Sequence, residues 1–92
     1  KKSYALKVKG ESMIDAGIND GDWVIIEESK KFYKSKVHVI LIDNQDVTLK
    51  YIEKVNSGEI KLIPANKVYK ETIYPVERIS IQGYVVGQVR IY

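Results

Sequence analysis

The sequence predicts an all-β domain of short antiparallel strands with few or no helices. Apolar and polar residues alternate in several short runs, which is the pattern of half-buried strands. Turn residues, mainly Asn, Asp and Gly, separate these runs at short intervals. One stretch, residues 13–18, has a pattern that fits a helix, and it is long enough for a single turn. The expected fold is therefore mainly β.

Three strands are expected in the first half of the chain, at residues 4–8, 23–27 and 37–42. The first strand leads to a possible helical turn, with Ser12 as its N-cap and Asp15 in the capping-box position. Asn19-Asp20-Gly21-Asp22 predicts a tight turn before the second strand, because Asp-Gly readily adopts the positive φ that such turns need.

Three further strands are expected at residues 47–52, 59–64 and 79–89. Asp43-Asn44-Gln45-Asp46 predicts a turn that joins the third and fourth strands into a β-hairpin. Residues 65–75 are interpreted as an irregular extended segment. Within the last strand, Gly83 and Gly87 are expected at bulges or bends.

Length and composition indicate one small soluble domain spanning residues 1–92. Ninety-two residues can form one core but leave no room for a second module. The chain is 45% hydrophobic and 29% charged, as globular proteins are. It has no cysteine, which excludes disulfides and thiol nucleophiles and fits a cytoplasmic location. No apolar run approaches the ~20 residues of a membrane span, so no membrane partner is expected.

Ser12 is the candidate nucleophile. A serine hydroxyl is a weak nucleophile at neutral pH, so it needs a base and a rigid turn that exposes its oxygen. Gly10 permits backbone conformations that are closed to other residues, and the apolar pair Met13 and Ile14 can anchor the segment beneath the serine. These neighbours would hold the hydroxyl on a fixed support.

Lys50 is the candidate base. It must be neutral to accept a proton, so burial has to lower its pKa from the usual value of about 10.4. Alternation in residues 47–52 places Thr48, Lys50 and Ile52 on one strand face. Thr48 would then hold the amine by a hydrogen bond, and Ile52 would exclude water from it. Lys54, at the polar end of this run, fits the alternative role of an edge-strand lysine better than Lys50 does.

Other polar residues point to structural roles. His38 is the one histidine, and it lies in the apolar run 37–42, so we interpret it as a structural residue and expect no Ser-His-Asp triad. Asp15, Asp20 and Asp22 lack the spacing and the distal glutamate of a calcium loop, so turn and cap roles are favoured. No metal and no cofactor are expected.

The two segments that carry Ser12 and Lys50 resemble a known family. The pattern Gly-x-Ser-Met-x-x-x-x-Ile-x-Asp-Gly-Asp-x-Val, starting at Gly10, followed by Val-Thr-Leu-Lys, is similar to the peptidase domain of LexA-type repressors and UmuD-type mutagenesis proteins. The resemblance extends from Leu6 to Gly87 and therefore covers nearly all of the chain.

This resemblance implies a LexA/signal-peptidase-like β-fold with a Ser12–Lys50 dyad. It also implies that Thr48 supports the lysine and that backbone N–H groups near Glu11 and Ser12 form an oxyanion hole. Met13 is expected to form a wall of the site. The implied activity is that of a serine endopeptidase that cleaves its own chain.

The resemblance also implies a biological setting. The chain would be the C-terminal domain of a LexA-like transcriptional repressor or another SOS-response protein, acting in the cytoplasm after DNA damage. Its substrate would be its own upstream cleavage segment, and a RecA–single-stranded DNA filament would stimulate cleavage. The domain would form a homodimer through its C-terminal strand, and DNA contact would require an N-terminal domain outside this chain.

Two departures from the family pattern are visible. Lys34-Ser35-Lys36 stands where family members often have a Gly-Asp turn. The one Ala-Gly pair, Ala16-Gly17, follows Ser12 too closely to fold back into the site. The scissile bond is therefore expected to precede this chain.

Two other functions remain open on the sequence. The same fold could be a catalytically silent dimerisation module of a phage-type repressor. Alternatively, seven tyrosines and a pI near 9.1 are compatible with a small OB-type barrel that binds single-stranded nucleic acid. Against the latter, Tyr51, Tyr84 and Tyr92 lie in apolar alternations that favour the core, and the basic residues are scattered along the chain.

Overall fold

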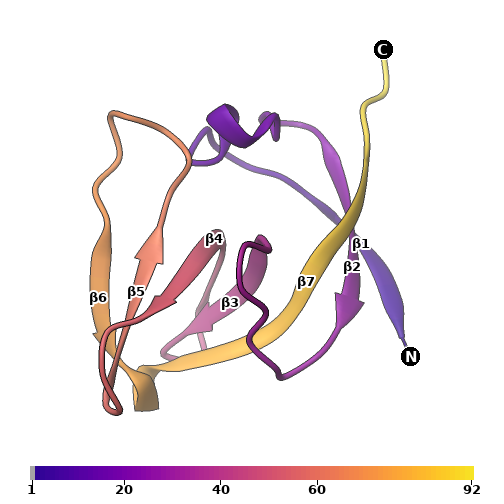
Figure 1. Cartoon of the computed structure of the whole chain (residues 1–92). Coiled ribbons are helices and arrows are strands. Elements are labelled where there is room, and N and C mark those ends of the chain that lie inside the picture. Colours follow the sequence, from indigo (N-terminus) through magenta and orange to yellow (C-terminus); the bar gives the residue numbers. More distant parts are fainter. Residues whose placement is uncertain (1) are drawn as a thin grey trace.

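The computed structural model describes residues 2–92 and shows a seven-stranded antiparallel sheet in the order β1-β2-β7-β3-β4-β5-β6 (Figure 1). The strands are β1 (Ser3–Lys7), β2 (Trp23–Glu28), β3 (His38–Ile42), β4 (Asp46–Lys54), β5 (Glu59–Ile63), β6 (Thr72–Pro75) and β7 (Ile79–Val89). Two 3₁₀ turns accompany them, η1 (Ile14–Ala16) and η2 (Val76–Arg78). The expected mainly-β fold is confirmed. Within residues 2–92 no helix has the length and apolar character needed to cross a bilayer.

The last strand, β7, lies inside the sheet and holds its two halves together. Residues 83–89 pair with β2 on one side, and residues 79–84 pair with β3 on the other. Both ladders shift register, next to Gly87 and next to Gly83, so the expected irregularities at these glycines are confirmed. A Cβ atom at Gly83 would lie 2.5 Å from the carbonyl oxygen of Glu27, so only glycine fits this close approach of β7 to β2.

The hairpin of β3 and β4 forms as its turn residues predict. Asp43 and Asn44 have φ angles of 54° and 57°, and the N–H of Gln45 donates to the carbonyl of Ile42. Positive φ at both central residues is the type I′ geometry that suits the twist of a hairpin. This turn sets the register in which β4 carries its lysine.

Two strand edges remain open near the N-terminal half of β4. β1 pairs with β2 alone. β4 pairs with β3 over residues 46–50 and with β5 only over residues 51–54. Within the described residues, β1 and the first half of β4 therefore each keep one unpaired edge.

The core consists of two clusters on opposite faces of β3. Val39 belongs to one cluster and its neighbour Ile40 to the other, because successive strand residues point to opposite faces. The first cluster comprises the buried residues Val8, Met13, Ile18, Val24, Ile26, Val39 and Leu49. The second comprises Ile40, Ile52, Ile60 and Leu62.

Some expectations need correction. The segment expected to be irregular, residues 65–75, contains β6 at its end, because Thr72–Pro75 pairs with β5. η2 was not foreseen. Tyr92, expected in the core, is fully exposed. Ser35 adopts a left-handed conformation with φ 66°, so the turn before β3 uses serine in a backbone region that glycine enters more easily.

Candidate active site

The turn before β2 contacts the segment that carries Ser12 and holds it in place. Gly10 has a φ of 86°, and its N–H donates to the carboxylate of Asp20 at 2.7 Å. Val8 exchanges backbone hydrogen bonds with this turn, donating to Asp22 and accepting from Gly21. The Asn-Asp-Gly-Asp turn thus fixes the position of the segment that leaves β1 and leads to Ser12. Asp20 has the turn role that the sequence favoured.

The loop after β5 holds the same segment from the other side. The N–H of Ala65 donates to the carbonyl of Ser12 at 2.8 Å, and the side-chain amide of Asn66 donates to the carbonyl of Glu11 at 2.7 Å. Met13 is 2% exposed and anchors the segment in the first core cluster. The serine backbone is therefore fixed by contacts from distant parts of the chain.

Ser12 does not cap the helical turn that follows it. The turn forms as η1, but its N-cap residue is Met13, and no side chain makes a cap hydrogen bond. The interpretation of Ser12 as an N-cap is therefore wrong, as is that of Asp15 as its capping-box partner. The hydroxyl of Ser12 makes a different contact.

The structure brings Ser12, Lys50 and Thr48 together. Lys50 Nζ lies 3.2 Å from Ser12 Oγ and 2.5 Å from Thr48 Oγ1. Thr48 and Lys50 share one face of β4, as their alternation predicted, and Ile52 is buried further along the same face. Ser12 and Lys50 are 38 positions apart in the chain, so tertiary folding alone makes this contact.

Lys50 lies in surroundings that favour its neutral form. Burial lowers the pKa of the Lys50 amine, because the charged form loses hydration. Within residues 2–92 no carboxylate forms an ion pair with it, whereas Lys61 on the neighbouring strand contacts Glu53 and Glu71. A partly buried lysine held by two hydroxyl groups can accept a proton, which a lysine paired with carboxylates cannot easily do.

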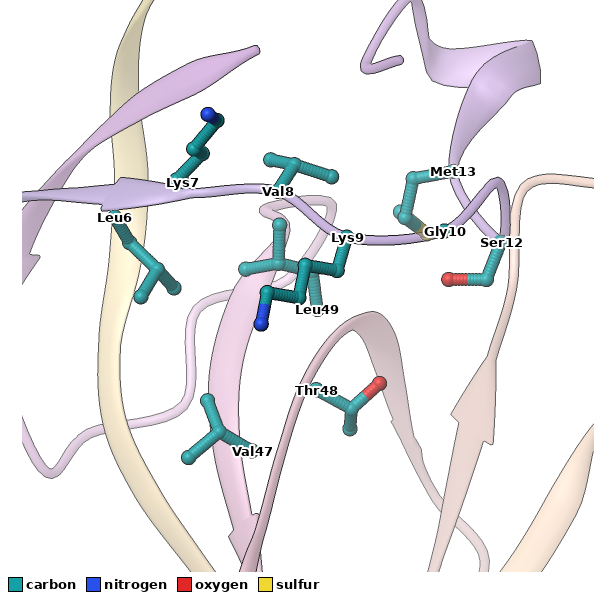
Figure 2. Close-up of a pocket in the computed structure, with 10 residues that line it drawn as sticks. All are labelled: Leu6, Lys7, Val8, Lys9, Gly10, Ser12, Met13, Val47, Thr48 and Leu49. Atoms are coloured by element: carbon teal, nitrogen blue, oxygen red, sulfur yellow. The ribbon is translucent and has the colours of Figure 1, made fainter. Parts of the chain in front are cut away.

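A cavity of about 270 Å³ lies beside Ser12, between the chain that leaves β1 and the open edge of β4 (Figure 2). Its lining is mainly apolar and includes Met13. It is lined by Leu6, Lys7, Val8, Lys9, Gly10, Ser12, Met13, Val47, Thr48 and Leu49. The hydroxyl of Ser12 and that of Thr48 lie at one end of it (Figure 2).

The backbone near Ser12 offers donors that the fold does not use. In the part of the chain that the structure describes, the N–H groups of Glu11 and Ser12 donate no hydrogen bond. Unpaired N–H groups beside a nucleophile can donate hydrogen bonds to a carbonyl oxygen and so stabilise the negative charge that develops on it. These are the groups expected to form the oxyanion hole.

His38 occupies a separate, closed environment. It is completely buried, its Nε2 accepts the N–H of Tyr33 at 3.1 Å, and its ring stacks on Phe32. Burial lowers the pKa of the imidazole, so the neutral form is favoured. Within residues 2–92 it makes no hydrogen bond to Ser12 or Lys50, which agrees with a structural role.

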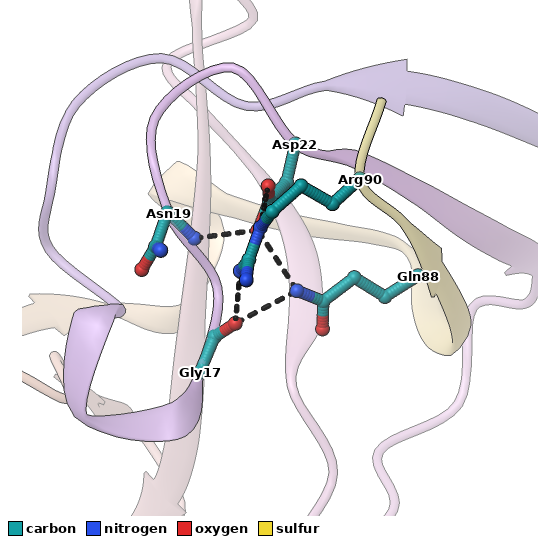
Figure 3. Close-up of polar contacts among 5 residues, drawn as sticks. All are labelled: Gly17, Asn19, Asp22, Gln88 and Arg90. Carbon is teal, nitrogen blue, oxygen red and sulfur yellow. Dashed lines mark hydrogen bonds and ion pairs between the residues drawn. The ribbon is translucent and has the colours of Figure 1, made fainter. Parts of the chain in front are cut away.

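A buried polar cluster around Asp22 was not foreseen from the sequence (Figure 3). Asp22 is 2% exposed, and its carboxylate accepts two hydrogen bonds from Arg90, at 2.8 and 2.9 Å, and one from Gln88. Both donors also contact the carbonyl of Gly17 at the end of η1. These bonds hold the pKa of Asp22 well below its usual range. The sequence shows an arginine directly after the last strand, which could have suggested a buried ion pair. Its partner could not be predicted from neighbouring residues, because Asp22 lies 68 positions earlier in the chain.

A mainly-β domain with a serine hydroxyl beside a partly buried lysine amine has the arrangement that a serine–lysine hydrolase requires. Comparison with known proteins narrows this class. The chain belongs to the Peptidase S24-like family, whose model matches residues 1–86. It is therefore a LexA-type peptidase domain.

Several curated relatives carry the same name. The chain is 45% identical to a LexA repressor of Zymomonas mobilis and 48% identical to one of Gluconacetobacter diazotrophicus, in each case over 97% of this chain. It is 39% identical to a LexA repressor of Erythrobacter litoralis. The matched regions cover 41%, 35% and 38% of those proteins, so the chain spans about two fifths of the length of the relatives it matches.

Proposed function

We propose that this chain is the self-cleaving peptidase domain of a LexA-like repressor, with Ser12 as the nucleophile and Lys50 as its base. The observation that carries the proposal is the 3.2 Å contact between Ser12 Oγ and the Nζ of Lys50, a partly buried lysine. Thr48 is assigned the role of holding the amine in line with the hydroxyl.

In the proposed reaction, neutral Lys50 takes the proton of Ser12 while Oγ attacks the scissile carbonyl carbon. The N–H groups of Glu11 and Ser12 stabilise the resulting oxyanion. The lysine then gives its proton to the departing amine, leaving an ester on Ser12. Water attacks this ester while Lys50 takes a proton from the water, and Lys50 then passes this proton to Ser12 Oγ as the ester bond breaks and the new carboxyl end is released.

The substrate is proposed to be an extended segment of the same protein, upstream of this chain. The cavity beside Ser12 lies next to the free edges of β1 and β4, and an extended peptide can pair with such edges through its backbone. Backbone pairing would present the scissile carbonyl to Ser12 with little dependence on most side chains.

The wider setting is proposed from the relatives named LexA repressor. We assign this chain to a cytoplasmic repressor of the SOS response that binds DNA through another domain and is triggered by a RecA–single-stranded DNA filament. A homodimer through the C-terminal end of β7 and the tail beyond it is supported by the exposed apolar residues Val86, Val89, Ile91 and Tyr92.

The test uses the full-length protein, incubated without any partner between neutral and alkaline pH. The rate of self-cleavage should rise with pH, because only neutral Lys50 accepts the proton, and should level off below the ordinary lysine value of 10.5, because burial lowers the pKa of Lys50. A rate that stays flat or falls over this range would contradict the role of Lys50.

Two variants complete the test. Ser12→Ala and Lys50→Ala should each reduce cleavage by more than about a thousandfold, since the pair acts as a unit. Lys54→Ala, on the same strand, is the matched control and should cleave at the normal rate. Folding is checked by circular dichroism, and a folded wild-type protein that never cleaves would instead favour the silent dimerisation module.

A further inference from the structure

Lys9 places an uncompensated positive charge over the cavity beside Ser12. Its side chain extends from the chain that leaves β1 toward β4, into the space between Leu6 and Ser12 (Figure 2). Within residues 2–92, no carboxylate forms an ion pair with Lys9 and no hydrogen bond involves its amine. Such an amine is available to a ligand.

The other charges near the cavity do not compete for this role. Lys7 lies over the ring of Trp23, 6.0 Å from its centroid, and Lys50 is held by the hydroxyls of Thr48 and Ser12. No acidic residue belongs to the lining, and the carboxylate of Asp20, which lies outside it, accepts the backbone N–H of Gly10. The lining is therefore mainly apolar, and Lys9 is the lysine in it that, within the described residues, neither an aromatic ring nor a hydroxyl group engages.

We propose that Lys9 is a specificity-determining residue that selects a substrate strand with an acidic side chain close to the scissile bond. The inference rests on the proposed function, because it takes Ser12 as the point of cleavage. An extended chain advances about 3.3–3.6 Å per residue, so the three-residue step from Lys9 to Ser12 limits the acidic residue to within about three positions of the bond. Apolar side chains of the same strand would face Leu6, Val47 and Leu49.

The test measures peptide binding and cleavage separately. Fluorescent ten-residue peptides with a central Ala-Gly bond carry Glu, Gln or Lys in turn at each of the three positions on either side of it. Binding is measured by anisotropy with the Ser12→Ala chain, and cleavage with the unmodified chain. Glu at one position should bind about two- to fivefold more tightly than Lys there, as expected for one partly solvated ion pair, and high salt should remove the difference.

Charge reversal at Lys9 supplies the decisive comparison. Lys9→Glu should reverse the preference at that position, whereas Lys30→Glu, which changes the net charge equally but lies outside the cavity lining, should leave it unchanged. Peptides that are bound and cleaved without any acidic preference, or with one that survives Lys9→Glu, would overturn the inference and leave the proposed function intact. A Lys9-dependent preference in binding without any cleavage would instead overturn the peptidase assignment. Absence of both binding and cleavage would overturn the two together.

Discussion

At the residue scale, Lys50 differs from the other lysines of the sheet in what surrounds it. Lys61 contacts two carboxylates, whereas Lys50 contacts two hydroxyls and is partly buried. Hydroxyl groups can hydrogen-bond to an amine without fixing its charge, so they permit the neutral form that a base requires. The local environment of one side chain therefore decides between a surface charge and a candidate base.

Thr48 should matter through its hydroxyl and not through its size. Thr48→Val keeps the volume but removes the 2.5 Å hydrogen bond to Lys50, so we expect self-cleavage to slow by about tenfold to a hundredfold. Thr48→Ser restores the hydroxyl and should recover most of the rate. Both rates are measured on the full-length protein at a fixed alkaline pH. Equal rates for the valine and serine variants would show that the hydrogen bond has no role.

At the scale of elements, the sheet depends on the close approach of β7 to β2 at Gly83. Both register shifts of β7 occur next to its glycines, where the strand changes from pairing with β3 to pairing with β2. This long strand joins the half of the sheet that carries β1 to the half that carries β4. The relative position of Ser12 and Lys50 follows from that connection.

Gly83→Ala should therefore be strongly destabilising. The added methyl group would meet the Glu27 carbonyl at 2.5 Å, and we expect the free energy of unfolding to fall by about 3 kcal/mol. Gly87→Ala is the matched control, because its Cβ would meet Ile25 at 3.5 Å, an ordinary contact, and it should cost less than about 1 kcal/mol. Urea unfolding followed by tryptophan fluorescence measures both. Similar midpoints for the two variants would contradict the steric argument.

At the scale of the whole molecule, the Asp22 cluster ties the end of the chain to the segment that carries Ser12, the proposed nucleophile. Gln88 lies near the end of β7, and Arg90 directly follows this strand. Their side chains meet Asp22, which directly precedes β2, near the end of η1 (Figure 3). The exposed pair of Arg78 and Asp43 has similar hydrogen bonds but remains in solvent. Removal of one partner is more damaging in a buried pair, because it leaves a buried charge unpaired.

Arg90→Ala should lower the melting temperature at neutral pH far more than Arg78→Ala. The pKa of Asp22 is depressed in the folded state, so its stabilisation is present above the unfolded pKa and is lost as pH falls through the folded pKa. The wild-type protein should thus keep this contribution well into the acid range, and Arg90→Ala should unfold at a higher pH. Thermal melts across an acid series measure this, and equal losses for the two variants would contradict it.

The proposed homodimer can also be tested at this scale. Ile91→Asp introduces a charge into the exposed apolar tail and should weaken self-association by about tenfold or more, as measured by sedimentation. Val68→Asp changes an equally apolar and exposed residue on the loop between β5 and β6, and should leave association unchanged. Association that is insensitive to Ile91→Asp would place the interface elsewhere.

Much of the fold and of the candidate site could be predicted from local patterns. Strand alternation placed Thr48 and Lys50 on one face, and Asp43-Asn44 predicted the hairpin turn, because side-chain direction and turn geometry depend on neighbouring residues. β6 escaped prediction, since four residues that end in proline carry too little alternation to indicate a strand. The Asp22 cluster and the position of β7 inside the sheet escaped it as well, because they depend on which strands pair.

By itself, the sequence predicted which residues carry the proposed chemistry and determined that they lie on a turn and a strand. Only the tertiary structure decided that Ser12 and Lys50 meet at 3.2 Å, that the amine is partly buried there, and that a mainly apolar cavity lined in part by Lys9 lies beside Ser12. The physical reason is that burial and distance between residues 38 positions apart depend on how the whole sheet closes, whereas alternation and turn signals act over only a few residues.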